Sequence, residues 1–200
     1  MTRIGVLALQ GAFAEHIEIL SRLGAQAVEV RLPEHLAGLD GLVVPGGEST
    51  TISHLMVEYG LLSSLQRMAS EGLPVWGTCA GLVMMAKRGA GIIFPTLAVM
   101  DIAVRRNAFG RQVDSFEADL DVPALGRSPF PAVFIRAPVI VDTGPQVQVL
   151  AWHNGGAIVA AQEGHLLATA FHPELTEDMR FHRHFLEIAV AAKAETGSNR

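Results

Sequence analysis

The chain has 200 residues, half of them hydrophobic, and a formal net charge of −5. This length predicts one domain over 1–200 with a sizeable core, and the absence of a lysine- or arginine-rich run excludes the charge pattern of a nucleic-acid binder. No apolar run reaches the roughly 18 residues that cross a membrane, and a single cysteine, which cannot form an internal disulfide, favours a reducing, cytoplasmic setting.

The first part of the chain alternates short apolar runs with segments of helical period. The first apolar run, 3–9, ends at Gly11, a pattern typical of a buried strand, whereas Phe13, Ile17 and Leu20 recur at helical spacing. The expected strands are 3–9, 25–31, 41–47 and 73–77, and the expected helices are 12–24, 49–60, 61–72 and 80–89. Ser49 or Thr50 is expected to cap the second helix.

The second part of the chain is richer in turn residues. It predicts short strands over 98–106, 111–120, 131–138, 146–151, 156–164 and 165–171, followed by a helix over 176–195. The alternation of strands and helices before them indicates a parallel sheet. The predicted fold is therefore α/β with three layers: a mostly parallel central sheet, helices on both faces and a small antiparallel extension, of the flavodoxin-like kind.

The only cysteine stands in the sequence G-T-C-A-G, between an expected strand and an expected helix. A sharp turn at this junction is the nucleophile elbow of G-x-S-x-G, here with Cys79 in place of serine and with Gly77 and Gly81 permitting the tight turn. A position at a helix N-terminus favours the thiolate. The N–H of Ala80 is placed to meet an oxyanion formed at Cys79. These features predict a nucleophile.

A cysteine nucleophile needs a base, and His172 is the best candidate among the eight histidines. It ends an apolar strand and is followed by Pro173 and Glu174. Proline favours extended backbone at His172, which would place the Glu174 carboxylate on the same side as the imidazole. The positions of His16, His35 and His54, on or near expected helices, fit surface or capping histidines. His182 and His184, two apart on a helix, are expected on different faces and not as a metal pair.

Two further segments are candidates to bind substrate. Gly46 and Gly47 end an expected strand, where backbone N–H groups can approach a ligand closely. Either Arg106 or Arg136 is a candidate to bind a substrate carboxylate in a bidentate manner. The alternatives to substrate binding are that the two glycines form an ordinary turn between strand and helix, and that the arginines are solvated or structural.

Taken together, the motifs resemble a known family. GVLALQGAFAEH, PGGESTT, GTCAGL, RRNAFGRQVDSFE, FIRAP and FHPELT follow one another in the order found in the glutaminase subunits of pyridoxal 5′-phosphate synthases, which are class I (triad) glutamine amidotransferases. The resemblance runs from about residue 4 to residue 190. G-x-C-x-G with H-P-E is typical of triad glutaminases generally, and RRNAFGRQ and PGGESTT narrow the resemblance to the vitamin B6 branch.

The resemblance implies an activity and a set of roles. The chain would hydrolyse L-glutamine to L-glutamate and ammonia, with Cys79 as nucleophile, His172 as base and Glu174 orienting His172. The N–H groups of Gly47 and Ala80 would form the oxyanion hole. The implied substrate-binding residues are Gly47, Glu48, Ser49, Arg106, Ile135 and Arg136. The resemblance implies no cofactor and no metal.

The resemblance also implies a partner. Ammonia would pass to a (β/α)8-barrel synthase subunit, which makes pyridoxal 5′-phosphate from a pentose 5-phosphate and glyceraldehyde 3-phosphate within a large hetero-oligomer. Gln10, Gly11 and the helix bearing Glu15 and His16 are expected near the docking face. The double glycine adds a hypothesis: the peptide between Gly46 and Gly47 turns to complete the oxyanion hole only when the partner docks.

Three other functions remain open at this stage. A glutaminase of the same fold could serve another synthase, such as the imidazole glycerol phosphate branch. A stand-alone cysteine hydrolase, such as a γ-glutamyl hydrolase, would share the elbow and the histidine. A non-catalytic binding module would keep the fold without the chemistry, a possibility that the intact Cys79, His172 and Glu174 disfavour.

Overall fold

The protein is described here by a computed structural model, which covers residues 1–108 and 115–198. In chain order the strands are β1 (Arg3–Leu7), β2 (Gln26–Val30), β3 (Gly41–Val44), β4 (Val75–Thr78), β5 (Ala86–Ala90), β6 (Met100–Arg105), β7 (Ser115–Leu120), β8 (Phe130–Ile135), β9 (Val139–Thr143), β10 (Gln148–His153), β11 (Ala157–Glu163) and β12 (Leu166–Thr169). The helices are α1 (Phe13–Arg22), α2 (Ser49–Glu58), α3 (Leu61–Ser70), α4 (Ala80–Met85) and α5 (Arg180–Ser198), with 3₁₀ turns η1 (Pro33–Leu36), η2 (Pro123–Leu125) and η3 (Pro173–Leu175).

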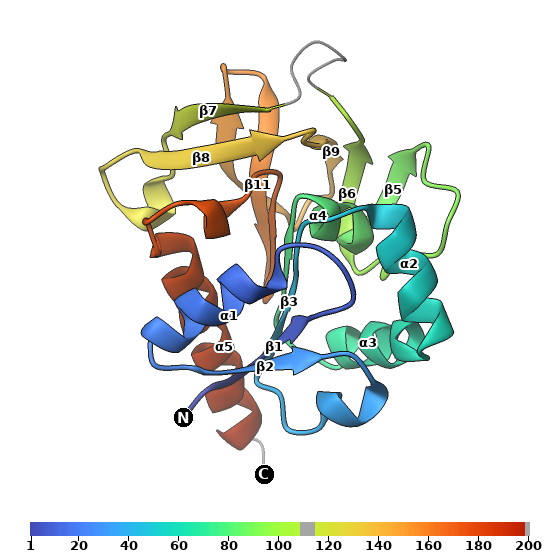
Figure 1. The fold of residues 1–200 in the computed structure, drawn as a ribbon. Helices are drawn as coiled ribbons and strands as arrows, with labels where there is room; N and C mark the ends of the chain where they lie inside the picture. The colour runs from blue at the N-terminus through green and yellow to red at the C-terminus, as the bar shows by residue number, and fades with distance from the viewer. Residues whose placement is uncertain (109–114, 199–200) are drawn as a thin grey trace.

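A ten-stranded sheet runs through the centre in the order β2-β1-β3-β4-β12-β11-β9-β6-β5, with β10 paired to β11. The first five strands in this order, β2, β1, β3, β4 and β12, run parallel to one another. Every residue of β3, β4 and β12 is buried, because helices cover both sides: α1 and α5 lie on one face, α2 and α3 on the other (Figure 1). This arrangement confirms the predicted three-layer α/β fold.

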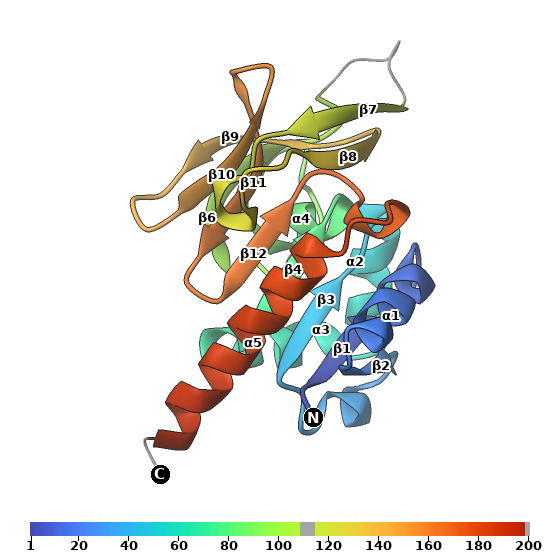
Figure 2. The ribbon, with the colours of Figure 1, turned by 90° about the vertical axis from the view of Figure 1, so that its left-hand side faces the viewer.

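Beyond β12 the sheet changes direction. β11 pairs antiparallel with β12 and with β9, and β9 pairs antiparallel with β6. β7 and β8 form a separate two-stranded antiparallel sheet, which lies at the same end of the molecule as this extension (Figure 2). The predicted antiparallel extension is thus present, and it continues the main sheet.

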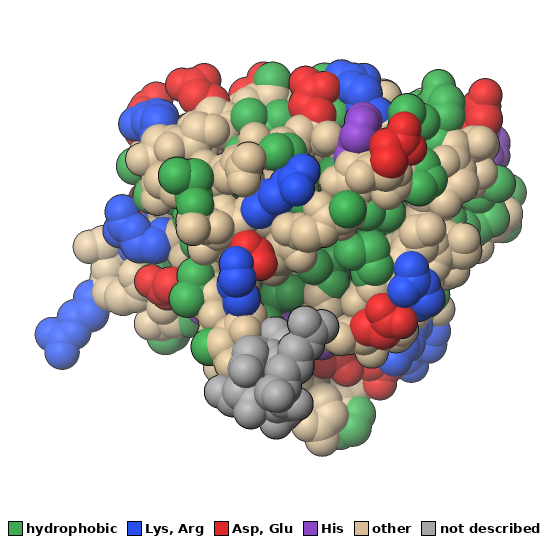
Figure 3. Space-filling view, turned by 90° about the horizontal axis from the view of Figure 1, so that it is seen from below, with side chains coloured by type: hydrophobic (Ala, Val, Ile, Leu, Met, Phe, Trp, Pro, Cys, Tyr) green, Lys and Arg blue, Asp and Glu red, His purple; other side chains and the backbone are tan. Residues whose placement is uncertain are grey.

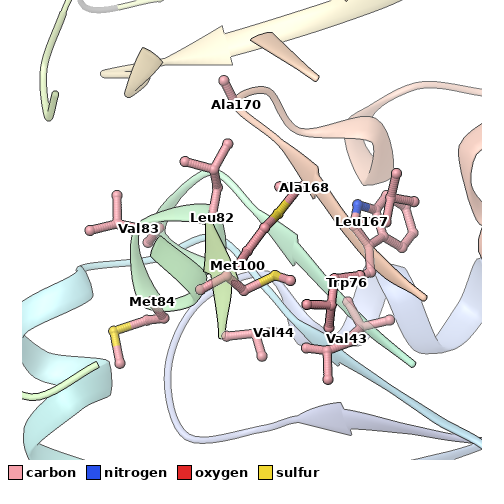
Figure 4. Close-up of a cluster of buried hydrophobic side chains, with 14 of the residues drawn as sticks. Val43, Val44, Trp76, Leu82, Val83, Met84, Met100, Leu167, Ala168 and Ala170 are labelled. Carbon is pink, nitrogen blue, oxygen red and sulfur yellow. The ribbon is translucent and has the colours of Figure 1, made fainter. Parts of the chain in front are cut away.

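The core between the sheet and the helices is apolar. Val43, Trp76 and Leu167 stand side by side on three adjacent parallel strands, with the Trp76 ring against Phe181 and Phe185 of α5. Leu82 of α4 belongs to the same buried cluster but lies apart from these three side chains (Figure 4). Their side chains are fully buried. Burial of this kind stabilises the fold by roughly 25 cal/mol per Å² of apolar surface removed from water.

The boundaries differ from the sequence prediction at several points. The helix expected over 80–89 ends at Met85, and the backbone turns extended at Ala86 to begin β5, which pairs with β6. Tertiary pairing here outweighs helical propensity. β9 was not predicted as a separate strand. The expected strand 111–120 begins, within the described residues, at Ser115, and its first part lies outside them.

The cap of α2 was also assigned wrongly. Glu48, not Ser49 or Thr50, is the N-cap, and its carboxylate accepts a hydrogen bond of 2.8 Å from the backbone N–H of Thr51. A carboxylate is well placed there because it satisfies a free N–H and faces the positive end of the helix. Partial burial would raise the pKa of Glu48, but hydrogen bonds from Thr51 and Thr50 lower it below its usual value.

Figure 3 shows the molecule from below the view of Figure 1. Acidic and basic side chains are interspersed there with hydrophobic ones, without a field of one sign. Among the described residues, no helix has the length and apolar character needed to span a bilayer.

Candidate active site

Cys79 lies at a sharp turn between β4 and α4. Its backbone has φ 49° and ψ −104°, a strained conformation for a residue with a side chain. The backbone N–H of Cys79 donates a 2.8 Å hydrogen bond to the carbonyl of Thr169 in β12, which holds the turn against the neighbouring strand. The structure therefore places Cys79 in the elbow geometry expected from G-x-C-x-G.

The two glycines of the motif are required by close packing. A Cβ atom on Gly77 would collide with the backbone of Gly81, and one on Gly81 would collide with the carbonyl of Val44. Neither glycine has a positive φ. Their role is to let three backbone segments approach one another, so that the strained turn at Cys79 is held from both sides.

His172 and Glu174 follow β12, the strand next to β4. Nδ1 of His172 lies 2.7 Å from Oε1 of Glu174, and both side chains are buried. The predicted pairing is present, but the predicted route to it was wrong. Pro173 begins the 3₁₀ turn η3 rather than continuing an extended segment, because proline is compatible with the first position of a helical turn.

Charge interactions dominate the ionisation of this pair. Burial alone would lower the pKa of His172, but Cys79 and Glu174 raise it to about 10. Burial alone would raise the pKa of Glu174, but His16 and His172 hold it well below its usual range. The pair therefore favours an imidazolium beside an ionised carboxylate. Since Nδ1 faces Glu174, Nε2 is the nitrogen available to Cys79.

A cavity of about 270 Å³ opens over Cys79. It is bordered by Gln10, Gly47, Glu48, Ser49, Cys79, Ala80, Val83, Arg106, Asn107, Ile135, Arg136, Pro138 and His172. Every site residue proposed from the sequence lies in this lining except Glu174, which stands behind His172, and Gly46, whose Cα lies against the His172 ring. The sequence did not single out Val83, Asn107 or Pro138, because an isolated apolar or amide residue carries no recognisable motif. Gln10 was assigned to the docking face rather than to the cavity.

Two charged residues flank the cavity mouth. The guanidinium of Arg106 lies 3.1 Å from Oε1 of Glu48, and its central carbon is 5.4 Å from the centre of the Phe94 ring. Arg106 is thus held between a carboxylate and an aromatic face. Arg136 is exposed and has φ 44°, directly after Ile135, whose carbonyl accepts a 3.7 Å hydrogen bond from the Cys79 thiol.

The glycine loop is tied to the chain that precedes α1. The backbone N–H of Ala12 donates a 3.2 Å hydrogen bond to the carbonyl of Gly46. Because a trans peptide directs its N–H opposite to its C=O, the N–H of Gly47 points away from Ala12. Oε1 of Gln10 accepts a 2.7 Å hydrogen bond from the N–H of Glu48. The segment 10–12 therefore supports the loop that borders the cavity.

One sequence-based assignment was wrong. His16 is neither a surface nor a capping residue: its side chain is fully buried and lies 3.3 Å from Oε2 of Glu174. Glu15 and Gly11 are exposed as expected. The apolar spacing of α1, which places His16 with Ile19 and Leu20 on the inner face, was the signal that could have located it.

Comparison with known proteins adds an independent finding. Residues 6–191 match the SNO glutamine amidotransferase family. The chain is 57% identical over 190 residues to "Pyridoxal 5′-phosphate synthase subunit PdxT" of Pelotomaculum thermopropionicum, covering 95% of this chain and 96% of that protein. It is 59% identical over 189 residues to the protein of the same name from Dehalococcoides mccartyi, covering 94% of this chain and 97% of that protein.

Solved structures agree with this result. The chain resembles a crystal structure described as a glutamine amidotransferase, with a TM-score of 0.88, 54% identity and coverage of 93% of this chain and 98% of that one. A chain in the structure of PurLQS from Thermotoga maritima matches with a TM-score of 0.69 at 15% identity, over 93% of this chain and 98% of that one, which shows a shared fold. The expected family is confirmed: the chain belongs to the SNO glutamine amidotransferase family.

Proposed function

We propose that the chain is the glutaminase subunit of a pyridoxal 5′-phosphate synthase and acts as a single glutamine amidotransferase domain over 1–200. The observation that carries the proposal is the placement of Cys79 at a strained elbow, in one cavity with His172, whose other nitrogen is held by Glu174. A chain of this family with this arrangement hydrolyses L-glutamine to L-glutamate and ammonia.

The reaction follows from the geometry. Sγ of Cys79 attacks the side-chain amide carbon of glutamine, and Nε2 of His172 holds the thiol proton. His172 then passes this proton to the departing nitrogen, so that ammonia leaves and a γ-glutamyl thioester remains on Cys79. Water attacks the thioester, His172 takes the proton of that water, and glutamate leaves as the thiol is regenerated. Glu174 keeps the imidazole oriented and stabilises its charge.

Charge that develops on the amide oxygen needs donors. The N–H groups of Gly47 and Ala80 are assigned as the oxyanion hole, since both residues border the cavity beside Cys79. Arg106 and Arg136 are assigned to the α-carboxylate of glutamine and Glu48 to its α-amino group. Ser49 and Ile135 complete the wall that holds the substrate.

The ammonia is used by a second protein chain. Ammonia is mostly protonated at neutral pH and then no longer nucleophilic, so a glutaminase that supplies a synthesis needs a partner that receives it away from bulk water. The proposed partner is a (β/α)8-barrel synthase subunit that combines the ammonia with a pentose 5-phosphate and glyceraldehyde 3-phosphate in a large hetero-oligomer. The reduced single cysteine supports a cytoplasmic location.

Docking of this partner is proposed to control the oxyanion hole. The exposed Gly11 and the partly buried Gln10 lie on the surface segment that holds the glycine loop through Ala12 and Glu48. A partner seated on this segment would act directly on the peptide between Gly46 and Gly47. High glutaminase turnover by the isolated chain would contradict this control while leaving the chemistry intact.

The test is an assay of glutamine hydrolysis by the purified chain, alone and with the synthase subunit, beside Cys79→Ala. We expect activity that requires the synthase subunit. It should fall by about 10³-fold or more in the variant, since removal of a covalent nucleophile leaves only residual catalysis. Activity on γ-glutamyl peptides without any partner would indicate a stand-alone hydrolase. Activation by another synthase alone would reassign the partner.

A further inference from the structure

A row of buried histidines stands behind the carboxylate of the triad. His16 of α1 and His182 of α5 are both fully buried. Nδ1 of His16 lies 2.9 Å from Nε2 of His182, and Nε2 of His16 lies 3.3 Å from Oε2 of Glu174. The other oxygen of Glu174, Oε1, is the one paired with His172. The carboxylate is therefore held between two imidazoles, and only one of them belongs to the triad.

The protons along this row can be assigned from the carboxylate outward. An ionised carboxylate only accepts, so Nε2 of His16 carries the proton that faces Glu174. In a neutral ring Nδ1 of His16 then accepts, and Nε2 of His182 donates to it. Burial lowers the pKa of His182 well below its ordinary value, so that ring is neutral. Nδ1 of His182 has no hydrogen-bond partner among the described residues, as fits its unprotonated nitrogen.

We propose that His16 and His182 are positioning residues of the glutaminase reaction: His16 supplies a second N–H to the Glu174 carboxylate, and His182 fixes the tautomer in which His16 does so. The inference rests on the proposed function and extends it from three residues to five. It gives a role to Oε2 of Glu174. This buried oxygen has no well-aligned hydrogen bond within the described chain, and Nε2 of His16 lies 3.3 Å from it.

The second donor is needed most in the middle of the reaction. While His172 is an imidazolium, its charge balances that of Glu174. Once His172 has given its proton to ammonia, the ring is neutral and Glu174 remains as a buried carboxylate. A buried charge without compensating donors is costly and tends to take up a proton. An N–H from His16 keeps Glu174 ionised at that stage, ready for His172 to accept a proton from water.

The surroundings keep the two histidines in place. The Trp76 ring meets His16 and His182 edge to face at 5.5 and 4.9 Å between ring centres. The hydroxyl of Thr78 lies 3.4 Å from Nε2 of His16 in hydrogen-bond geometry, so Thr78 and the Glu174 carboxylate, at 3.3 Å, share that side of the ring. The imidazoles form a line rather than a ring around one point, and the described residues contain no cluster of ligands that would hold a metal ion.

The test compares an apolar and a conservative variant at each position. His16→Leu removes the donor, whereas His16→Gln retains an N–H close to the position of Nε2; His182→Leu and His182→Gln form the second pair. In glutamine hydrolysis with the synthase subunit present, we expect kcat to fall by about tenfold or more in the leucine variants with KM unchanged, and most of it to return in the glutamine variants. His184→Leu, two residues from His182 and bonded to Gln162, is the matched control and should keep full activity.

A second readout does not depend on the partner. Cys79 is the only cysteine, so alkylation by iodoacetamide, followed by mass spectrometry, reports its thiolate alone. A weaker hold on Glu174 makes the imidazolium beside Cys79 less stable, so the pH midpoint of alkylation should rise by about one unit in the leucine variants, a tenfold slower reaction below the midpoint. Equal kcat and equal alkylation profiles in wild type and His16→Leu would overturn the inference. Failure of the wild type itself to hydrolyse glutamine would instead count against the proposed function.

The wild-type protein offers a check that needs no substitution. Nitrogen-15 NMR of histidine-labelled protein distinguishes the two neutral tautomers of each ring. We expect a protonated Nε2 on both His16 and His182. The glutamine variants, each of which lacks one of the two rings, assign the resonances to their residues. An unprotonated Nε2 on His16 would overturn the inference even if every leucine variant failed to fold.

Discussion

Gly81 lies against the carbonyl group of Val44 with no room between them for a side chain. Val44 ends β3, the strand beside β4, and Gly81 is the second residue of α4. The contact therefore presses the first turn of α4 onto the end of the neighbouring strand. Cys79 can turn sharply and still be followed at once by a helix because neither Gly81 nor Gly77 carries a side chain that would hold the backbone segments apart.

Gly81→Ala is expected to destabilise the fold strongly. The added Cβ would meet backbone rather than a flexible side chain, so the cost should reach the upper end of overpacking effects, about 3 kcal/mol or more in the free energy of unfolding. Urea denaturation measures it. Gly156→Ala, where the added Cβ would meet open space, is the control and should change stability by less than about 1 kcal/mol. Equal small effects at both positions would contradict the packing argument.

Gly46→Ala should affect the reaction more than the fold. Its added Cβ would collide with the imidazole of His172, which would have to shift while keeping its bond to Glu174. Because misplacing a catalytic base by a fraction of an ångström is costly, we expect kcat to fall by about 10²-fold or more. Steady-state kinetics with the synthase subunit check this. Retained kcat would mean that His172 tolerates a shift that this geometry excludes.

Arg106→Gln should weaken substrate binding. The arginine is assigned to the glutamine carboxylate, and loss of a charge-assisted pair costs about 1.5–3 kcal/mol, which corresponds to a rise in KM of roughly 10- to 100-fold. Its ion pair with Glu48 is partly exposed, so stability should change by at most about 1 kcal/mol. Arg67→Gln, which breaks an exposed pair with Glu71, is the control and should leave KM unchanged.

The raised pKa of His172 makes stability depend on pH. The folded protein holds this proton up to about pH 10, whereas the unfolded chain releases it near 6.5. The associated stabilisation is complete below about pH 6.5 and is lost as the pH rises through about 10. We expect the difference in unfolding free energy between wild type and His172→Gln to shrink over this range, measured by urea denaturation. A difference independent of pH would show that Cys79 and Glu174 do not hold the proton on His172.

Much of the parallel half of the fold was predictable. Strands such as β3 and β12 are buried on both faces, so their apolar residues form continuous runs bounded by turn residues. The end of α1 was also predictable, since Gly24, just after the C-cap Leu23, adopts the positive φ of 84° that favours glycine at a helix end. β5 was missed because its sequence, with Lys87 and Arg88 exposed, takes its conformation from pairing with β6.

The triad was predictable from short motifs, but its supporting residues were not. Cys79 stands in a motif whose spacing has a mechanical reason, and Glu174 lies two residues from His172. His16 reaches Glu174 from another helix, at a separation of more than 150 residues along the chain. No local pattern encodes such a contact, since only the packing of α1 against the turn η3 creates it.

Cys79 and His172 come from strands that are adjacent in the sheet and distant in the chain. The register of β4 with β12 pairs Thr78 with Thr169, so main-chain hydrogen bonds set the spacing between nucleophile and base. The intervening chain leaves the parallel sheet after α4 and returns at β12, touching the pair mainly through Val133 and Ile135 of β8. Lengthening or reshaping the other loops of this excursion leaves the reacting atoms in place. Changes in these loops can thus reshape the surroundings of the cavity without separating the nucleophile from its base.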